Sequence, residues 1–437
     1  MSDYTRQSRL LTIIVALGVI ATFTYHFFLY TSMEPVPLAT SALRGNEARS
    51  TEATTVTSPS QDEWTRDRML QLVKEAGSRL SEAIDAPFDV DKSHITRGIA
   101  VYFPASEAQQ EKELKGLLLS IAHMRTSQPS SMKTDLVVFT PPRGYKFAKS
   151  IGCTEEKRTS FDDPERCVIV QHIPLSERPG VNDPLLSYKR YLDSVLMVAE
   201  YKDYNSYDYL MKSDMDTFVV PAFADWRLPQ GKIIATGRGG YGHPNANGRL
   251  SYIMKTTFGM RDEGRHNIGT TWYGSPAVLV AACQVSVASM RWLDRMEFTE
   301  YERVHHTTDA WPYWYWPVLT MYGGHIAINQ IPQDRVQFQE DNVMEMDYGS
   351  DAGGELRPSV KHLHCWHTDR FFSKFAFAMG KYDKMDLNEH DNMKTPPAYS
   401  AVIALSAVRM STEEFKSITQ DPERMRNNEW KRLTAGA

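Results

Sequence analysis

Short apolar runs alternate with segments of helical periodicity from Thr96 onward, and this alternation limits the possible folds more than any other feature of the chain. Continuous apolar runs at residues 98–103, 135–140, 167–170 and 207–212 predict strands that are buried on both faces. Strands of this kind separated by helices indicate an α/β domain with a mostly parallel sheet flanked by helices. Ligands of such sheets bind beyond the carboxyl ends of the strands, so we expect the functional site there.

Three segments outside these runs have the spacing of helices. Residues 111–123 and 184–201 are expected as helices between the strands. Residues 62–84 are expected as an amphipathic helix that packs on the main domain. Its apolar positions at helical spacing are Met69, Val73, Ala76, Leu80 and Ile84.

Residues 10–30 contain no Asp, Glu, Lys or Arg. As a helix rising about 1.5 Å per residue, this stretch reaches roughly 30 Å, which is the thickness of a bilayer's hydrocarbon core. It is longer than the apolar core of a cleaved signal peptide, which has about 7–15 residues. Arg6 and Arg9 precede it and the first base after it is Arg44, which places the N-terminus in the cytosol. The sequence therefore predicts a single-pass type II membrane protein, and a long cleaved signal is the alternative.

The predicted organisation along the chain follows from this anchor. Residues 1–9 form a cytosolic tail, 10–30 a transmembrane signal-anchor, and 31–60 a disordered stem rich in Ser, Thr and Pro. Residues 61–95 then form the amphipathic stem helix, 96–385 the catalytic domain, and 386–437 a C-terminal helical extension. The balance of 49 basic and 54 acidic residues argues against a nucleic-acid partner.

The four cysteines are too few for a disulfide-based scaffold. Cys153 and Cys167 flank a polar loop, and the predicted compartment permits a disulfide between them without requiring one. Cys283 lies in an apolar run and is expected to be a buried thiol.

Two carboxylates, Asp214 and Asp216, directly follow the apolar run at residues 207–212, and a second apolar run follows them at 218–220. Carboxylates one residue apart at a strand end suit Mn²⁺ or Mg²⁺, which in turn neutralises a diphosphate. A solvated surface turn is the alternative. Two charges between buried flanks are costly unless something compensates them, which favours the metal site.

With this acidic pair after its fourth strand, an N-terminal anchor and a Ser/Thr/Pro stem, the chain resembles a Golgi-type type II membrane glycosyltransferase of the GT-A fold, which is related to the Rossmann fold. The resemblance covers roughly residues 96–381 and does not single out one glycosyltransferase family. It implies that Asp214 and Asp216 hold Mn²⁺ or Mg²⁺ on the diphosphate of a nucleotide-diphosphate sugar. It also implies a hexosyltransferase-like activity toward a glycan or glycoprotein acceptor, with the catalytic domain in the lumen of the Golgi or another secretory-pathway compartment.

The same resemblance suggests further ligands of the donor. Lys189 or Arg190 would contact phosphate or base, unless they belong to a solvated helix face. His364 or His367 would complete the coordination of the metal, and Lys374 would contact the diphosphate. One alternative is a zinc site made by His362, His364, Cys365 and His367, although its spacing does not match the usual paired ligands. Another alternative is a purely structural histidine cluster.

On the acceptor side, Asp309 precedes an aromatic run and resembles the acidic residue that lies near the transferred sugar. It would position or deprotonate the acceptor hydroxyl, or would serve only as a helix N-cap. Two glycine-rich segments, 236–242 and 267–274, are expected as loops, and Gly323-Gly324 is expected to allow close approach of a sugar. Residues 339–358 are expected to form a mobile lid or an exposed insertion. The residues expected to bind sugar hydroxyls are Asn267, Thr270 and Trp272.

Two other classes of function remain open at this level. The same acids and histidines could serve a metal-dependent, for example zinc-dependent, luminal hydrolase with water as acceptor. The chain could also be a non-catalytic, membrane-anchored carbohydrate-binding relative of the fold.

Overall fold

The computed structural model describes residues 64–188, 191–305, 313–366, 372–387 and 393–434, all within one compact unit, Pro59–Ala437. The expected cytosolic tail, transmembrane helix and stem lie outside the described residues, as do Lys189, Arg190, Asp309 and His367. Among the described residues, one helical stretch, Pro276–Glu297, is long and apolar enough to cross a membrane. It is 83% buried inside the protein, as expected of a core helix.

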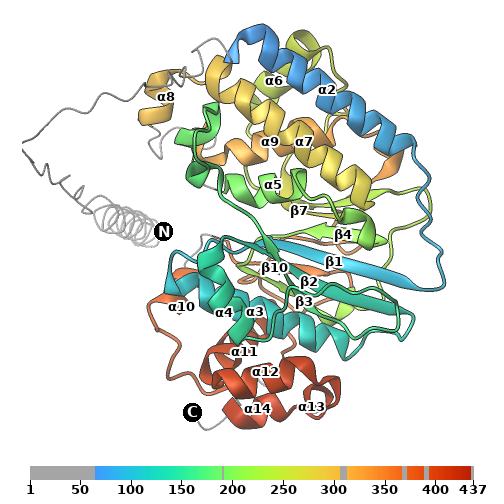
Figure 1. Ribbon diagram of the computed structural model, residues 1–437, viewed down its shortest axis with the longest axis vertical. Helices are drawn as coiled ribbons and strands as arrows, with labels where there is room; N and C mark the ends of the chain where they lie inside the picture. The colour runs from blue at the N-terminus through green and yellow to red at the C-terminus, as the bar shows by residue number, and fades with distance from the viewer. Residues whose placement is uncertain (1–63, 189–190, 306–312, 367–371, 388–392, 435–437) are drawn as a thin grey trace, which may run out of the picture. The chain divides into compact units, whose positions relative to one another are not determined.

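Seven of the described strands form one sheet in the order β3-β2-β1-β4-β7-β6-β8 (Figure 1). Only β7 among them runs antiparallel to its neighbours, so the sheet is mostly parallel, as predicted. The four strands expected from the apolar runs are β1 to β4. The strand bounds are β1 Ile95–Tyr102, β2 Met132–Thr140, β3 Cys167–Gln171, β4 Tyr209–Lys212, β6 Ile234–Arg238, β7 Ile268–Gly274 and β8 Val336–Phe338.

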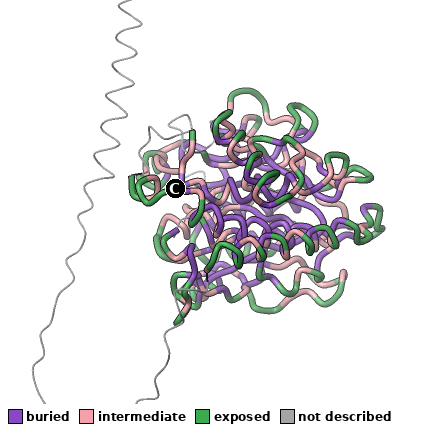
Figure 2. The backbone as a smooth tube through the Cα atoms, turned by 90° about the horizontal axis from the view of Figure 1, so that it is seen from above, coloured by how far each residue is buried: buried purple, intermediate pink, exposed green. Residues whose placement is uncertain are grey.

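Helices cover both faces of this sheet (Figure 1). Successive residues of β1 serve opposite cores: Ala100 packs in one, and Ile99 and Val101 pack in the other. Buried residues accordingly fill the interior, and exposed residues lie at the periphery (Figure 2). Over the Ala100 face lie α2 Arg66–Asp85, α5 Leu192–Ala199, α7 Pro276–Trp292 and α9 Leu319–Ile328. Over the other face lie α3 Ala108–Arg125, α11 Pro396–Arg409, α12 Thr412–Gln420, α13 Pro422–Arg426 and α14 Glu429–Thr434.

The amphipathic helix expected at residues 62–84 is α2, in which all five predicted apolar positions are buried. The side chain of Thr65 caps the helix by accepting a hydrogen bond from the backbone N–H of Arg68. At the other end of the chain, α11 is buried along most of its length and packs against α3. The helices after residue 385 therefore share the core of the sheet domain and are not an appended extension.

The single helix expected at residues 184–201 is wrong. The segment begins with a 3-10 turn, Pro184–Ser187, which the side chain of Asp183 caps. Tyr188 is fully buried and its hydroxyl donates to the carbonyl of Pro317, and Tyr191 has a φ of 55°. A left-handed residue cannot continue a helix, so α5 begins only at Leu192.

The loop expected at 267–274 is wrong, because Ile268–Gly274 form strand β7. The loop expected at 236–242 is wrong only for its first residues, which end β6, and residues 239–242 lie outside any strand. The glycines are needed for close approach rather than for turns. A Cβ on Gly274 would lie 2.2 Å from the carbonyl oxygen of Ile233 on the neighbouring segment. Gly323 and Gly324 likewise serve packing of α9, because a Cβ on Gly324 would lie 2.8 Å from the ring of Trp272.

A second sheet has the order β5-β10-β9. Its strands are β5 Thr217–Val219, β9 Tyr348–Gly349 and β10 His362–His364. β10 pairs antiparallel with β5, so that His364 lies opposite Thr217. Residues 344–351 are largely buried beside this sheet, which contradicts the expected lid or exposed insertion for the middle of 339–358, whereas residues 340–343 and 353–355 are exposed.

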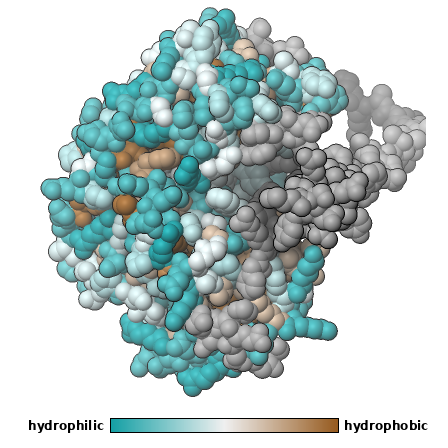
Figure 3. All heavy atoms as spheres, turned by 180° about the vertical axis from the view of Figure 1, so that it is seen from behind, coloured by the Kyte–Doolittle hydropathy of each residue, from teal (hydrophilic) through white to brown (hydrophobic). Residues whose placement is uncertain are grey.

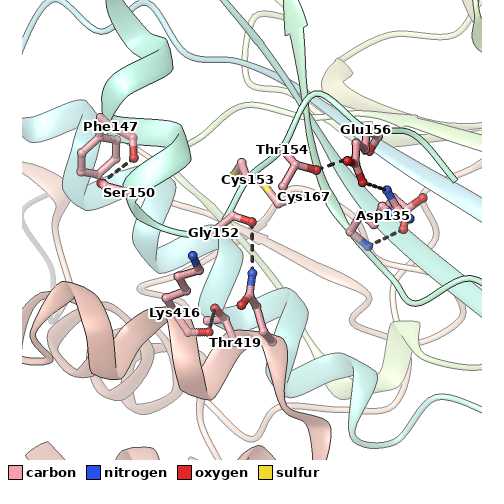
Figure 4. Close-up of a disulfide and its surroundings, with 12 residues drawn as sticks. Asp135, Phe147, Ser150, Gly152, Cys153, Thr154, Glu156, Cys167, Lys416 and Thr419 are labelled. Carbon is pink, nitrogen blue, oxygen red and sulfur yellow. Dashed lines mark hydrogen bonds and ion pairs between the residues drawn. A yellow bond between two sulfur atoms is a disulfide. The ribbon is translucent and has the colours of Figure 1, made fainter.

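Cys153 and Cys167 form a disulfide (Figure 4). It closes the loop before β3, and the side chain of Gln420 on α12 donates to the carbonyl of Gly152, 3.2 Å away. Cys283 is a buried free thiol, as expected. The face of the molecule opposite to Figure 1 is mainly hydrophilic, and its apolar patches are small and separate (Figure 3).

Candidate metal centre

Three side chains meet just beyond the carboxyl end of β4. Asp214, Asp216 and His364 each offer one ligand atom, and these atoms all lie within 4.8 Å of one another. The two acids come from the turn between β4 and β5, and His364 is the last residue of β10. The backbone N–H of Cys365 donates to the carbonyl of Asp216 at 2.9 Å, which fixes the end of β10 against the acidic turn.

Buried hydroxyl groups hold the turn without occupying its carboxylates. Thr217 donates its Oγ1–H to the carbonyl of Asp214 at 2.7 Å. The Ser213 hydroxyl lies 3.0 Å from Thr217 Oγ1 and 2.9 Å from His362 Nε2. The side-chain oxygens of the acidic pair are thus left to face His364 and the lysines around them.

Asp216 lies between two cationic side chains. Its Oδ2 is 2.5 Å from Lys374 Nζ, at the start of α10 Lys374–Ala378, and its Oδ1 is 3.5 Å from His364 Nε2. Burial alone would raise the pKa of Asp216, but Lys374 and His364 outweigh it and hold that pKa well below its usual range. Burial would lower the pKa of His364, but Asp216 and Asp347 raise it to about 10. The cluster is therefore a tightly charged pocket.

A second lysine lies beneath Asp214. Lys212, the last residue of β4, has a side chain that is 3% exposed, and its Nζ is 4.0 Å from Asp214 Oδ1. The same Nζ donates to the carbonyl of Thr270 on β7 at 2.8 Å. A buried ammonium group at this place compensates part of the negative charge of the acidic turn.

Sequence reasoning missed Asp347, which contacts the site from behind His364. Its Oδ1 lies 3.3 Å from His364 Nδ1, and the backbone N–H of Thr271 donates to its Oδ2 at 2.9 Å. Burial opposes ionisation, but His364, His362 and Thr271 lower the pKa of Asp347 to about 2. A signal was present, because Met344 and Met346 alternate with acids in the pattern of a strand.

Glu113 on α3 was also missed, because it lies in an ordinary polar stretch of a helix. Burial and the nearby charge of Asp216 raise its pKa to about 7, and the Gln109 side chain donates to it at 2.8 Å. With Asp216 and Lys374 it lines a cavity of about 20 Å³, which has room for about one water molecule.

The residues expected to bind sugar hydroxyls lie on or next to β7. Asn267 has a φ of 56° and its Oδ1 accepts from the backbone N–H of Gly242 at 2.5 Å. Thr270 is half-buried, and its Oγ1 finds no hydrogen-bond partner among the described residues. Trp272 is 3% exposed and donates its indole N–H to the carbonyl of Gly269. An indole so enclosed has no free face for a sugar, and we leave Trp272 out of the proposed site.

The described part of the alternative zinc site does not assemble. His362 is fully buried, its Nε2 contacts the hydroxyl of Ser213, and burial lowers its pKa to about 4. Cys365 is also buried, and burial raises the pKa of its thiol. Neither residue belongs to the group of possible ligands that the described residues form around Asp214.

The ligand set fits a hard or borderline divalent cation. Two carboxylates and one imidazole suit Mn²⁺, and the two carboxylates also suit Mg²⁺. Three protein ligands are fewer than an octahedral ion needs, so a bound ion would keep positions for oxygens of a substrate.

Comparisons with known proteins give one family and two distant structural likenesses. Residues 91–432 match the family described as Domain of unknown function (DUF7164). A search of curated proteins finds no match. Mouse xyloside xylosyltransferase 1, apo form, aligns at 12% identity and a TM-score of 0.31, over 58% of this chain and 87% of that chain. The apo structure of the bifunctional glycosyltransferase WbbM aligns at 12% identity and a TM-score of 0.33, over 65% of this chain and 48% of that chain. Both are glycosyltransferases, and likenesses at this level do not assign an activity.

Proposed function

We propose that this chain, which belongs to the family described as Domain of unknown function (DUF7164), is a metal-dependent glycosyltransferase that uses a nucleotide-diphosphate sugar. The observation that carries the proposal is the meeting of Asp214, Asp216 and His364 beyond the carboxyl end of β4. Carboxyl ends of parallel strands are where α/β proteins bind their ligands. Oxygen-rich sites with open positions are those that hold a cation on phosphate groups.

In the proposed reaction, the bond between the anomeric carbon and the diphosphate breaks with its electron pair on the diphosphate oxygen. The acceptor oxygen forms the new bond to that carbon and gives its proton to a base, for which Asp309 is the candidate. A divalent cation would stabilise the negative charge of the departing diphosphate. The cation would be held by Asp214, Asp216 and His364. The ammonium group of Lys374 would leave Asp216 and bind the diphosphate instead.

Other parts of the proposal rest on residues around this centre. Lys189 or Arg190 would contact the donor. Asn267 and Thr270 would bind sugar hydroxyls, and the unpaired Oγ1 of Thr270 supports this role for Thr270. We propose a glycan or glycoprotein as acceptor and a type II anchor at residues 10–30 in a Golgi or other secretory-pathway membrane. The Cys153–Cys167 disulfide supports an oxidising compartment for the described domain.

Thermal unfolding of the full-length chain in detergent, with UDP, GDP or CMP and with or without Mn²⁺, tests the proposal. We expect one diphosphate to stabilise the protein only when Mn²⁺ is present. A ligand at 100 times its dissociation constant adds about 2.7 kcal/mol, which is easily seen. Asp216→Asn should abolish the shift, and Asp225→Asn, which changes an exposed carboxylate after β5, should leave it intact. Absence of a shift with every nucleotide and metal would contradict the proposal.

A further inference from the structure

We propose that Asp347 is a positioning residue of the metal centre, which holds the Nδ1–H of His364 and so turns the Nε2 lone pair toward Asp214 and Asp216. The inference rests on the proposed function, because it concerns the same metal centre. It assigns a role to a buried acid that does not itself reach the group of ligand atoms.

The two nitrogens of His364 face two different carboxylates. Nδ1 lies 3.3 Å from Asp347 Oδ1, and Nε2 lies 3.5 Å from Asp216 Oδ1. A cation that binds His364 must displace the proton of one ring nitrogen, and the nitrogen that faces the enclosed carboxylate of Asp347 keeps its proton. Because Asp347 is only 2% exposed, its carboxylate retains the Nδ1–H of His364, and Nε2 is the nitrogen left to bind a cation.

Asp347 is itself fixed from the opposite side by one residue of β7. The backbone N–H of Thr271 donates to Oδ2 at 2.9 Å, and the Thr271 hydroxyl donates to Oδ1 at 2.5 Å. His362 adds a third neighbour, with its Nδ1 3.7 Å from Oδ1. The carboxylate can therefore neither rotate nor withdraw from His364 without losing a buried hydrogen bond.

The large sheet provides the space for this carboxylate. A Cβ on Gly237 of β6 would lie 2.2 Å from Asp347 Oδ2, and a Cβ on Gly269 of β7 would lie at the same distance. The backbone of Asp347 has a φ of 54°, which is unusual for a residue other than glycine. Asp347 thus requires two neighbouring glycines and a strained backbone conformation of its own. Both lower the stability of the fold, which is unexpected for a residue that only fills the core.

Asp347→Asn tests the inference with little change in shape. The backbone N–H of Thr271 needs an acceptor, so the amide oxygen of the asparagine should take the place of Oδ2. Its NH₂ group then faces His364 Nδ1 and donates to it, which moves the imidazole proton to Nε2. A protonated Nε2 cannot bind a cation.

The measurement is Mn²⁺ binding to the full-length chain in detergent, by the electron paramagnetic resonance signal of free Mn²⁺. Pulsed resonance of the bound ion then detects the nitrogen of a histidine ligand. We expect the wild type to show this nitrogen coupling and His364→Gln to lose it. We expect Asp347→Asn to raise the dissociation constant for Mn²⁺ by about 10–100-fold and to lose the nitrogen coupling. A merely structural role would not change the coupling of the bound ion.

Glu345→Gln is the matched control. It makes the same carboxylate-to-amide change two residues away, where Glu345 is equally buried but contacts Ser359 and Arg357 instead of His364. Its dissociation constant and nitrogen coupling should equal those of the wild type. If Asp347→Asn does not fold, Thr271→Val decides, because loss of the hydroxyl bond to Asp347 should weaken Mn²⁺ binding in the same direction by a smaller factor.

The outcomes separate this inference from the proposed function. Wild-type affinity and nitrogen coupling in Asp347→Asn, or in Thr271→Val if that variant decides, overturn the inference. If Asp214→Asn and Asp216→Asn abolish Mn²⁺ binding but His364→Gln does not, the inference fails and the carboxylate site of the proposed function stands. If the folded wild type binds no Mn²⁺ with any nucleotide, both fail.

Discussion

Lys374 competes with a divalent cation for the same carboxylate. Its Nζ lies 2.5 Å from Asp216 Oδ2, and Asp216 raises the pKa of this lysine although burial opposes it. A cation that binds Asp216 must therefore displace the ammonium group, which is then available for a phosphate oxygen.

Lys374→Met should consequently have opposite effects on two ligands. Binding of Mn²⁺ alone should become tighter, because no ammonium group has to leave Asp216, and a charged hydrogen bond of about 1.5–3 kcal/mol gives a change of about tenfold or more. Binding of the nucleotide diphosphate with Mn²⁺ should become weaker by a similar factor. Calorimetric titration measures both constants. Lys112→Met is the control, because Lys112 lines the same cavity of about 20 Å³ as Lys374. If Lys374→Met changed both dissociation constants equally and in the same direction, the competition would be contradicted.

At the scale of elements, β7 pairs with two strands of the large sheet and also holds Asp347 behind the metal centre. Its Gly269 lies where a Cβ would be 2.2 Å from Asp347 Oδ2 and 2.6 Å from the backbone of Gly237. Neither neighbour can move, since one is a buried acid and the other belongs to a paired strand.

Gly269→Ala should therefore destabilise the protein. Overpacking of this kind costs about 1–3 kcal/mol, and the contact with Gly237 is with backbone rather than with a flexible side chain. Urea unfolding measures the difference. Gly240→Ala, where a Cβ would meet nothing within 4 Å, should change stability little. Equal midpoints for the two variants would show that the strands can spread apart without cost.

The sequence predicts elements well where periodicity is strong. Strands β1 to β4 are buried on both faces and therefore appear as continuous apolar runs. Helix α2 is buried on one face and therefore shows its five apolar positions at helical spacing. Segments 236–242 and 267–274 look like loops in the sequence, because their Gly237 and Gly269 allow the close approach of Asp347, which is distant in the sequence. Asp214 and Asp216 are visible from their place after a strand, but the part played by Asp347 depends on tertiary contacts that no local pattern encodes.

At the scale of the whole molecule, buried histidines link stability to pH. Burial lowers the pKa of His123 and His362 to about 4 and that of His325 to about 3. The unfolded chain takes up protons on these residues near pH 6.5, whereas the folded protein does not, so stability falls as the pH falls below 6.5. Glu113 acts in the opposite direction, because its raised pKa of about 7 lets the folded protein hold a proton that the unfolded chain has lost.

We therefore expect the metal-free protein to lose stability between pH 6.5 and 4.5. Each histidine contributes up to about 1.4 kcal/mol per pH unit, and Glu113 cancels one of the three, which leaves up to about 3 kcal/mol per pH unit. His364 does not alter this window, since its pKa is raised to about 10 and its contribution is complete below pH 6.5. Urea unfolding at pH 7, 6 and 5 measures the slope. A flat profile would mean that the histidines are hydrated in the folded protein.

The pairing of β5 with β10 joins a turn in the middle of the chain to a strand near its end. During synthesis, Asp214 and Asp216 emerge from the ribosome long before His364 does, and α11, which packs on α3, emerges later still. A nascent chain therefore exposes an acidic turn that is preceded by Lys212 but has neither His364 nor Lys374. The centre closes only after β10 and α10 have been synthesised, so that a message truncated before β10 yields a protein that holds the acids but cannot assemble the full ligand set.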